Sequence, residues 1–419
     1  MTGRDVFSAA VRLLNYTNTY GELDGNQGTE MWKRSLAIVN QIYADVSFIE
    51  NQTAAFVPLK NIHETLHVSD RTAADVMPYG VAMLFAQNEH EKLEPASVTK
   101  IMTLLLTMDA IDSGALAYDD VVTVSANAAG MGGSQVFLAE GEQITVEELL
   151  KCVCVSSGND AAVALAEKVA GVTELFVEQM NNRARGLGMD DTHFVNPTGL
   201  TAEGHVTSAH DIALMSRELL TKHPDIRRFA TIWTDSIRNG TFDLANTNKL
   251  IRRYDGATGL KTGYTASAGY CISATAEREG MELIAVVMKG ETADKRNADA
   301  KALLNYGFSA YALVSAAPEE PLPALPVTMG ETDSVSLTLP PDALTAVVEK
   351  AQAAALERRI DLPESLPAPV RQGQQVGTLT LCSGDTELVT VPILAAEDAA
   401  GRSWGRMFTD LLKMAVFAG

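Results

Sequence analysis

The stretch EPASVTKIMTLLL, residues 94–106, places Ser97 and Lys100 at the head of an apolar run. The run from Ile101 to Leu106 requires burial and Pro95 is well tolerated near a helix start, so the sequence predicts Ser97 in the first turn of a buried helix. Residues three apart share a helical face, which brings the Lys100 amine beside the Ser97 hydroxyl. A serine nucleophile without a histidine partner needs such an amine. An ordinary amphipathic helix start shows the same short pattern, so the pattern alone does not establish catalysis.

Length and composition indicate a folded protein of two or three domains, since the chain has 419 residues of which 46% are hydrophobic. The formal net charge of −20 argues against a nucleic-acid partner and predicts a solvated acidic surface, within which local basic patches can exist. The cysteines are too few and too scattered for a disulfide scaffold, and the Cys-x-Cys pair lacks a second pair that would complete a zinc site. We expect all of them to be packing residues: Cys152, Cys154, Cys271 and Cys382.

The two ends of the chain carry different expectations about membranes. The first residues, MTGRDVFSAAVRLLNYTNTYG, lack the basic start and uninterrupted apolar stretch of a secretory signal, and no apolar run is long enough to span a bilayer. Residues 402–419, RSWGRMFTDLLKMAVFAG, place apolar residues at spacings of three and four, opposite a basic face with Arg402, Arg406 and Lys413. This pattern predicts a helix on an anionic membrane surface. A terminal helix that packs on the protein itself would show the same apolar stripe.

Composition and periodicity divide the chain into five segments. GYCISATAE and MELIAVVMKG look like adjacent strands joined by a turn, and VGTLTL and TELVTVPIL like a hairpin around CSGD. Prolines mark a linker in SAAPEEPLPALP. The expected segments are an atypical helical N-terminal segment (1–85), a catalytic domain (86–312), the linker (313–326), a small β-rich domain (327–400) and the amphipathic C-terminal helix (401–419).

Two further short motifs follow Ser97 along the chain. SSGNDAAVALAE places Ser157, Gly158 and Asn159 in a turn before a helical run, and GLKTGYTASAGYC leads from Lys261 into a strand. Either motif alone is most simply a turn. In the order S-x-x-K, S-G-N and K-T-G, separated by about 60 and about 100 residues, the three resemble the motifs of penicillin-binding serine acyl transferases and β-lactamases.

Within that superfamily the chain most resembles the D-alanyl-D-alanine carboxypeptidases of low molecular mass, over roughly residues 85–400. The segments FAQNEHEKLEPASVTKIMT, MGGSQVFLAEGEQITVEELL, GMDDTHFVNPTGL, NTNKLIRRYDGATGLKTGYT and ADAKALLNYGF carry the resemblance. It implies an α/β (α+β) fold: an antiparallel sheet flanked by helices, a helical subdomain that completes the cleft, and a separate C-terminal β domain. It also implies peptidoglycan pentapeptide stems and β-lactam antibiotics as ligands, no metal or cofactor, and a place on the outer face of the cytoplasmic membrane.

The residue types in these motifs suggest catalytic roles. Ser97 would attack the carbonyl of the penultimate D-alanine while Lys100 takes its proton, which requires a neutral lysine. Burial and the nearby charge of Lys261 both lower the pKa of Lys100. Ser157 and Asn159 would line the opposite wall, with Ser157 placed to relay the proton to the departing D-alanine.

The third motif and the residues near it would bind the substrate. The backbone N–H groups of Ser97 and of Tyr264, which follows Gly263, would form an oxyanion hole. Lys261 and Thr262, together with Arg296, would bind the terminal carboxylate, for which the planar arginine fork is suited. Arg296 could instead be a surface residue on an acidic face.

Three alternatives remain open from the sequence. A class A β-lactamase needs a glutamate in a Glu-x-x-Leu-Asn segment, and none lies between residues 160 and 260. His63, Glu64 and His67 match the His-Glu-x-x-His zinc peptidase pattern, but no third histidine ligand follows at the required spacing. A penicillin-binding protein with impaired turnover is the third, because the strand hairpin that precedes the nucleophile in the family is replaced here, which would leave the sheet without a strand.

Overall fold

The computed structural model describes residues 56–58, 83–318, 320–340, 345–353, 355–384 and 386–402. These residues fall into two compact units that divide between residues 308 and 309. The first unit contains all three sequence motifs, and the second is almost entirely β structure.

An antiparallel sheet in the order β1-β8-β7-β6 forms the centre of the first unit. Strands β7 (Gly269–Arg278) and β8 (Met281–Gly290) form the hairpin that the sequence predicts, with Ala274 opposite Ala285. Strand β6 (Ala257–Thr265) pairs with β7 and carries the K-T-G motif. Apolar and small residues follow one another in β7 and β8 without strict alternation because both strands are buried along most of their length.

Strand β1 (Phe56–Pro58) pairs with β8 at the edge of this sheet, with Phe56 opposite Ala285. These three residues therefore correct the expectation that residues 1–85 are helical and that the sheet lacks a strand beside β8. The exposed backbone groups of an edge strand offer hydrogen bonds to any extended segment, and proline is tolerated at such an edge. Residues 83–85 form neither helix nor strand, and the remainder of the predicted helical segment, including His63, Glu64 and His67, lies outside the described residues.

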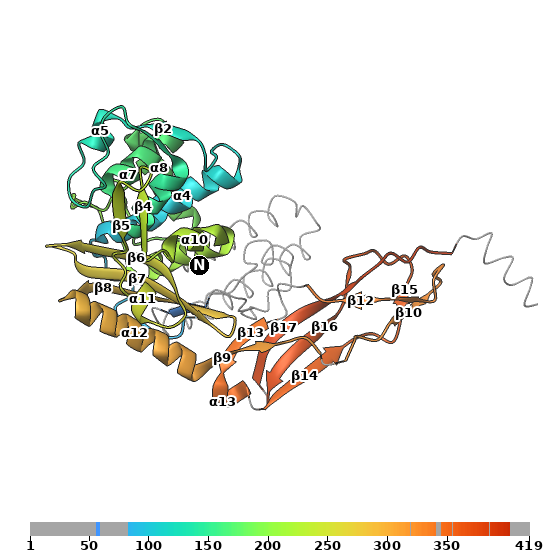
Figure 1. Cartoon of the computed structure of the whole chain (residues 1–419). Helices are drawn as coiled ribbons and strands as arrows, with labels where there is room; N and C mark the ends of the chain where they lie inside the picture. Colours follow the sequence, from blue (N-terminus) through green and yellow to red (C-terminus); the bar gives the residue numbers. More distant parts are fainter. Residues whose placement is uncertain are drawn as a thin grey trace, which may run out of the picture. The chain divides into compact units, whose positions relative to one another are not determined.

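Helices cover the sheet on both sides, with α12 (Ala293–Ala310) on one side and the group from α4 to α10 on the other (Figure 1). Helix α9 packs on β7 and β8, and the short α10 packs on β6. The bounds of this group are α4 Lys100–Asp112, α6 Val146–Val155, α7 Asn159–Ala170, α8 Thr173–Gly186, α9 Ala209–Lys222 and α10 Arg227–Ala230.

Helix α4 is the core helix of the first unit and contacts α7 and α9. Its residues from Lys100 to Leu105 are buried or nearly so on every face, as the uniformly apolar stretch predicts. Side-chain caps fix two neighbouring helices: Thr145 Oγ1 accepts the backbone N–H of Glu148 (3.2 Å) at α6, and Ser208 Oγ accepts that of Asp211 (3.2 Å) at α9.

Short elements complete the first unit. They include the 3₁₀ helix η1, which carries Ser97, and the two-stranded sheets β2–β3 and β4–β5. The bounds are η1 Ala96–Thr99, β2 Val121–Thr123, α5 Ala126–Ala129, β3 Gln143–Thr145, η2 Pro224–Ile226, β4 Thr234–Ile237, β5 Phe242–Ala245 and α11 Leu250–Arg253.

The second unit is built around the predicted hairpin of β16 (Gln375–Ser383) and β17 (Thr386–Ala395). Leu379 and Leu381 of β16 face Val389 and Val391 of β17 in its core, with the period of two that a half-buried sheet requires. The first strand of the unit, β9, covers part of the stretch that the sequence assigns to the linker. The remaining bounds are β9 Tyr311–Ser315, β10 Leu325–Thr328, β11 Ser334–Val335, β12 Leu337–Thr338, β13 Thr345–Glu349, α13 Lys350–Ala353, β14 Leu356–Asp361 and β15 Leu366–Pro367.

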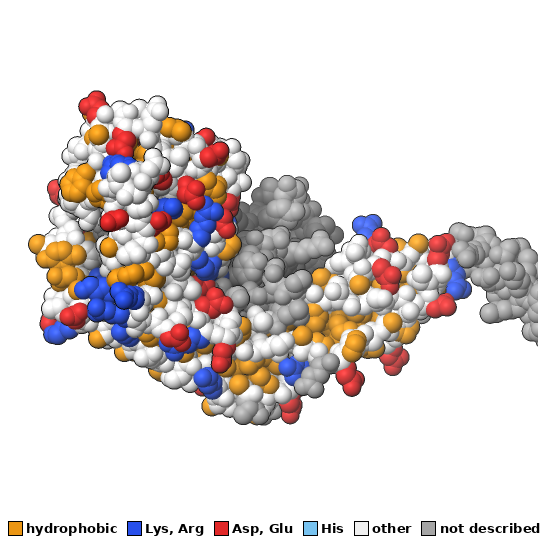
Figure 2. Space-filling model, viewed as in Figure 1, with side chains coloured by type: hydrophobic (Ala, Val, Ile, Leu, Met, Phe, Trp, Pro, Cys, Tyr) orange, Lys and Arg blue, Asp and Glu red, His pale blue; other side chains and the backbone are white. Residues whose placement is uncertain are grey.

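The surface of the described parts carries both signs of charge, and one group of Lys and Arg side chains gathers on the face shown in Figure 2.

All four cysteines are free and buried, which confirms them as packing residues. Of the predicted C-terminal helix (401–419) only Gly401 and Arg402 lie within the described residues. Among the residues that are described, no helix has the length and apolar character needed to cross a membrane.

Candidate active site

The nucleophile motif spans the junction of two helices. Ser97 lies in η1, and Lys100 is the first residue of α4 and is fully buried. The Lys100 Nζ lies 2.8 Å from the Ser97 Oγ, as the spacing of three residues predicts. Burial of the lysine, rather than its spacing alone, separates this pair from an ordinary helix start.

Two further oxygens surround the Lys100 amine. Nζ donates to Asn159 Oδ1 at 2.6 Å and to the backbone carbonyl of Thr198 at 2.7 Å. Asn159 is the first residue of α7, so the second motif meets the first at this amine. Thr198 belongs to a loop that the sequence reasoning did not select as part of the site.

The loop that carries Thr198 is a tight turn built from the sequence Asn-Pro-Thr-Gly. Asn196 Oδ1 accepts the backbone N–H groups of Thr198 (3.1 Å) and Gly199 (2.7 Å). A Cβ at Gly199, whose φ is +80°, would lie 1.8 Å from the Ala96 carbonyl oxygen, so only glycine allows the turn to pack on η1. Asparagine, proline and glycine together signal a turn, but no local pattern tells which carbonyl faces the lysine.

Ser157 precedes α7 in a strained backbone conformation, with φ of +62°. Its hydroxyl is buried and has no hydrogen-bond partner among the described residues. A buried hydroxyl without a partner costs free energy unless a ligand or water satisfies it. This combination of strain and an unsatisfied hydroxyl is typical of a functional position.

The third motif lies along β6 against the nucleophile turn. A Cβ at Gly263 would lie 2.9 Å from the Ser97 nitrogen and 2.8 Å from the Pro95 carbonyl oxygen, so this glycine permits the close approach of β6 to η1. Buried Lys261 donates from Nζ to the Thr262 carbonyl (3.0 Å), and Thr262 Oγ1 donates to Thr247 Oγ1 (2.7 Å).

Tyr264 comes directly after Gly263 on the same strand. Its ring is 55% exposed and lies 4.3 Å from the ring of Tyr270, which is its register partner on β7. The side chain is therefore at the surface, while the backbone belongs to the strand that approaches Ser97.

Burial controls the charge of both lysines. It lowers the pKa of Lys100 well below the usual value; the charge of Lys261 lowers it further, and Asp160 opposes the shift. Burial also lowers the pKa of Lys261 to about 7, with the charge of Arg296 acting in the same direction. Burial and the charge of Lys261 thus both favour the neutral form of the Lys100 amine.

Arg296 lies in α12 and is 4% exposed, which rules out a place on an acidic surface. Its Nη1 donates to the Cys271 carbonyl at 3.2 Å, and its Nη2 donates to Asn297 Oδ1 at 2.9 Å. Cys271 stands opposite Gly263 in the β6–β7 register, so the guanidinium is anchored to the strand next to the K-T-G motif.

Asp160 is a second residue of the site that the sequence reasoning missed. It accepts the backbone N–H groups of Val136 (3.0 Å) and Leu138 (3.1 Å), and so joins their loop to the start of α7. An aspartate at a helix start ordinarily indicates a favourable charge at the N-terminal end, so the local pattern gave no sign of a loop anchor.

His205 also supports the nucleophile helix. Its Nε2 lies 2.9 Å from Thr99 Oγ1, and its Nδ1 accepts the Val195 N–H at 2.9 Å. Burial lowers the pKa of His205 to about 4, so the imidazole is neutral at neutral pH. The histidine therefore acts here as a hydrogen-bonding member of the core.

This fold and site define a serine hydrolase of the penicillin-binding superfamily. A family model described as D-alanyl-D-alanine carboxypeptidase matches residues 76–292, and one described as the C-terminal domain of penicillin-binding protein 5 matches residues 319–400. The chain belongs to the D-alanyl-D-alanine carboxypeptidase family.

Relatives and solved structures agree with this assignment. The D-alanyl-D-alanine carboxypeptidase DacF of Bacillus subtilis is 41% identical over 321 residues, covering 75% of this chain and 82% of the relative. Penicillin-binding protein 5 of Haemophilus influenzae matches with a TM-score of 0.67 at 26% identity, over 82% of this chain and 96% of that one. Penicillin-binding protein D2 of Listeria monocytogenes, in its cefotaxime-bound form, matches with a TM-score of 0.50 at 33% identity, over 56% and 94%.

Proposed function

We propose that this chain removes the terminal D-alanine from peptidoglycan pentapeptide stems through an acyl-enzyme on Ser97. The observation that carries the proposal is the environment of the buried Lys100 amine, which has three oxygens within hydrogen-bond distance. Two of them, the side-chain carbonyl of Asn159 and the backbone carbonyl of Thr198, can only accept.

The proton positions follow from this arrangement when the amine is neutral. A neutral lysine amine has two N–H groups and one lone pair. Both N–H groups go to the carbonyls of Asn159 and Thr198, so the lone pair faces the Ser97 hydroxyl. Ser97 then donates its O–H to Lys100, which is the arrangement that a general base needs before attack.

The first chemical step joins Ser97 Oγ to the carbonyl carbon of the penultimate D-alanine, while its proton passes to Lys100. The backbone N–H groups of Ser97 and Tyr264 would stabilise the oxyanion, which the close approach at Gly263 supports. Collapse of the intermediate breaks the peptide bond. The leaving amine takes a proton through Ser157, whose buried hydroxyl suits a relay. Water then hydrolyses the ester, freeing Ser97 and the shortened stem.

Lys261 and Thr262 of the third motif, together with Arg296, would hold the terminal carboxylate. Lys261 and Thr262 lie on β6, and Arg296 is anchored on the neighbouring strand β7 through Cys271. The two oxygens of a carboxylate can accept hydrogen bonds from a guanidinium and from a hydroxyl at the same time. The negative charge of the carboxylate would also favour the charged form of Lys261.

Covalent binding of penicillins is part of the same proposal. A β-lactam presents a strained amide to Ser97 and leaves an acyl group on the same oxygen. The cefotaxime-bound form of the Listeria protein supports a β-lactam ligand for this fold.

The decisive experiment labels the protein with a fluorescent penicillin and measures release of D-alanine from diacetyl-L-lysyl-D-alanyl-D-alanine. Wild type should be labelled at Ser97 and should release D-alanine, and Ser97→Ala should lose both activities. Label on another residue would refute the role of Ser97. Labelling without release would instead establish a penicillin-binding protein with impaired turnover.

We also propose that residues 402–419 attach the chain to the outer face of the cytoplasmic membrane. The support is the sequence pattern alone, an apolar helical stripe opposite Arg402, Arg406 and Lys413. Flotation on anionic vesicles should carry the full chain but leave behind a version that ends at residue 401. If both versions stay in the soluble fraction, the attachment proposal is wrong.

A further inference from the structure

Phe137 presents its ring to solvent from the loop between α5 and β3. The side chain is 69% exposed although both of its neighbours, Val136 and Leu138, are buried. Its φ is +56°, in the left-handed region that a bulky side chain rarely adopts. An exposed aromatic ring in a strained conformation gains nothing from the core, so its position needs another reason.

Four hydrogen bonds hold the backbone around Phe137 in this conformation. The Asp160 carboxylate accepts the N–H of Val136 and of Leu138, at 3.0 and 3.1 Å. The Arg238 guanidinium donates to the carbonyls of Val136 and Phe137 itself, at 2.9 and 3.0 Å. Arg238 is fixed in turn by Glu142, at 2.7 Å. Side chains from two other parts of the fold thus impose the outward position of the ring.

The same loop forms part of the wall of the candidate active site. Its Ser134 carbonyl accepts the Asn159 backbone N–H at 2.7 Å, and its Gly132 carbonyl accepts Asn159 Nδ2 at 2.6 Å. Asn159 contacts the Lys100 amine through its other side-chain atom. The loop that carries Phe137 is therefore joined directly to the catalytic wall.

A second aromatic ring stands beside the first. Phe242 of β5 lies 6.3 Å from Phe137 in an edge-to-face arrangement, and the Arg238 guanidinium lies 5.3 Å from the Phe242 ring centroid. Thr247, two residues after the end of β5, accepts the hydroxyl of Thr262. The aromatic pair thus joins the loop that contacts Asn159 to β5, and the segment that follows β5 contacts the third motif.

We infer that Phe137 and Phe242 form an aromatic subsite that binds the aliphatic side chain of the residue preceding the D-alanyl-D-alanine end. The inference rests on the proposed function, in which Lys261, Thr262 and Arg296 take the terminal carboxylate on the leaving-group side. The aromatic pair is uncharged, and the loop that carries Phe137 contacts Asn159 through Gly132 and Ser134, so the pair suits the acyl side of the substrate. Aliphatic C–H groups pack on aromatic faces, and a ring held in place by its backbone loses little entropy when it binds.

The test compares two peptides: N-acetyl-D-alanyl-D-alanine, which lacks the preceding residue, and diacetyl-L-lysyl-D-alanyl-D-alanine, which has it. The measured quantity is the ratio of kcat/KM for the long peptide to kcat/KM for the short one. In Phe137→Gly this ratio should fall about threefold to tenfold, the size of one lost aromatic contact. Phe137→Tyr keeps the ring and should keep the ratio.

The glycine variant separates binding from folding. Glycine adopts a φ of +56° without strain, so the melting temperature of Phe137→Gly should equal or exceed that of wild type. The matched control is Leu175→Ala, which removes another exposed apolar side chain, 51% exposed on α8. It should leave the ratio unchanged.

The outcomes are distinguishable. An unchanged ratio in Phe137→Gly, with wild type active on both peptides, overturns the subsite and leaves the proposed function intact. A wild type that releases no D-alanine from either peptide overturns the proposed function itself. An equal fall in Phe137→Gly and Leu175→Ala also overturns the subsite, because the effect would then not be specific to the ring.

Discussion

Lys100 and Lys261 are two buried amines in one site, and each has a lowered pKa. For Lys100 the largest cause is burial and the second is the charge of Lys261. Because a general base must be unprotonated, acylation should rise with pH as Lys100 loses its proton. The charge of one lysine therefore adjusts the working pH range of the other.

A charge-removing variant tests this coupling. In Lys261→Met the charge that lowers the pKa of Lys100 is gone, so that pKa rises and the acid limb of the pH profile moves to higher pH. The measurement is the second-order rate of penicillin acylation between about pH 5 and 9, where lysines with lowered pKa titrate. Lys261→Arg retains a positive charge and is the control. If the acid limb of the acylation profile lies at the same pH in Lys261→Met and in wild type, the charge of Lys261 does not affect the pKa of Lys100.

Gly263 permits the close approach of β6 to η1, and a substitution at this position tests whether catalysis needs that approach. A Cβ at this position would lie 2.9 Å from the Ser97 nitrogen, so Gly263→Ala should push β6 and η1 apart. Displacement of the reacting groups by about 1 Å lowers the rate about 100-fold, and penicillin acylation should fall accordingly. Circular dichroism and melting temperature should show a folded protein. Acylation at the wild-type rate would mean that the close approach is not needed.

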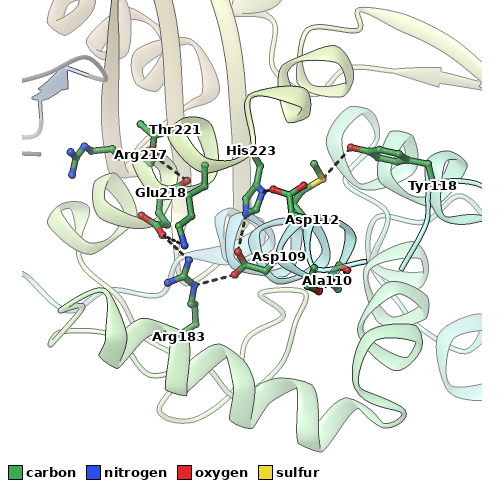
Figure 3. Close-up of polar contacts among 12 residues, drawn as sticks. Asp109, Ala110, Asp112, Tyr118, Arg183, Arg217, Glu218, Thr221 and His223 are labelled. Atoms are coloured by element: carbon green, nitrogen blue, oxygen red, sulfur yellow. Dashed lines mark hydrogen bonds and ion pairs between the residues drawn. The ribbon is translucent and has the colours of Figure 1, made fainter. Parts of the chain in front are cut away.

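Buried His223 follows the last turn of α9, at the junction of this helix with α4 (Figure 3). Its Nε2 lies 2.9 Å from Asp109 Oδ1 and its Nδ1 lies 2.6 Å from Asp112 Oδ2, both on α4. Arg183 of α8 joins Asp109 to Glu218 of α9. Two carboxylates can only accept, so both ring nitrogens of His223 donate and the imidazole is charged.

Burial and hydrogen bonding act in opposite directions on the pKa of His223. Burial lowers it, but the hydrogen bonds to Asp109 and Asp112 outweigh burial and raise the pKa above the usual value. A group whose pKa is raised by folding adds stability that is complete below its unfolded pKa and is lost as pH rises through the folded pKa. The pKa of Asp109 is lowered in the folded protein. Its contribution to stability is therefore lost as pH falls through that lowered pKa, which limits the stabilising pH range on the acid side.

His223→Gln should therefore be destabilised most near pH 6 and progressively less at higher pH. One charged hydrogen-bond pair is worth about 1.5 kcal/mol here, because the Asp112 side chain is 56% exposed and its pair is screened by water. The measurement is the difference in free energy of unfolding from wild type between about pH 5 and 9, on either side of an ordinary histidine pKa. His193→Gln, at an exposed histidine, is the control. A difference that does not change with pH would contradict the charged bridge.

At the scale of the whole molecule, every residue of the candidate site lies in the first unit. The second unit has its own apolar core, with Leu379, Val391 and Ile393 fully buried. Units with separate cores fold independently when few contacts are needed between them.

A chain that ends after Ala310, at the end of α12, should therefore keep its acylation rate within about twofold of the full chain. The measurement is fluorescent penicillin labelling over time at equal protein concentration, with Ser97→Ala in the same truncated chain as the control. A folded but unlabelled truncated protein would show that the site depends on residues 311–419.

Features that depend on neighbours along the chain could be predicted from the sequence alone. Helical spacing put Ser97 beside Lys100, and strand-like runs predicted the β7–β8 and β16–β17 hairpins. The spacing and the hairpins follow from local geometry, in which the periods of helix and strand fix what lies together. The order of the three motifs identified Ser157, Asn159 and Lys261 as site candidates through the resemblance to the family, because no local pattern brings these segments together.

Contacts between distant segments could not be predicted from the sequence and are seen only in the folded structure. It placed the Thr198 carbonyl and the Asn159 side chain on Lys100, buried Arg296, and gave Ser157 its strained conformation with an unsatisfied hydroxyl. It also placed residues 56–58 as a strand, because the free edge of β8 offers hydrogen bonds that no local pattern records. The physical reason is the same in each case: the energy of these groups depends on burial and on partners that folding brings in from elsewhere in the chain.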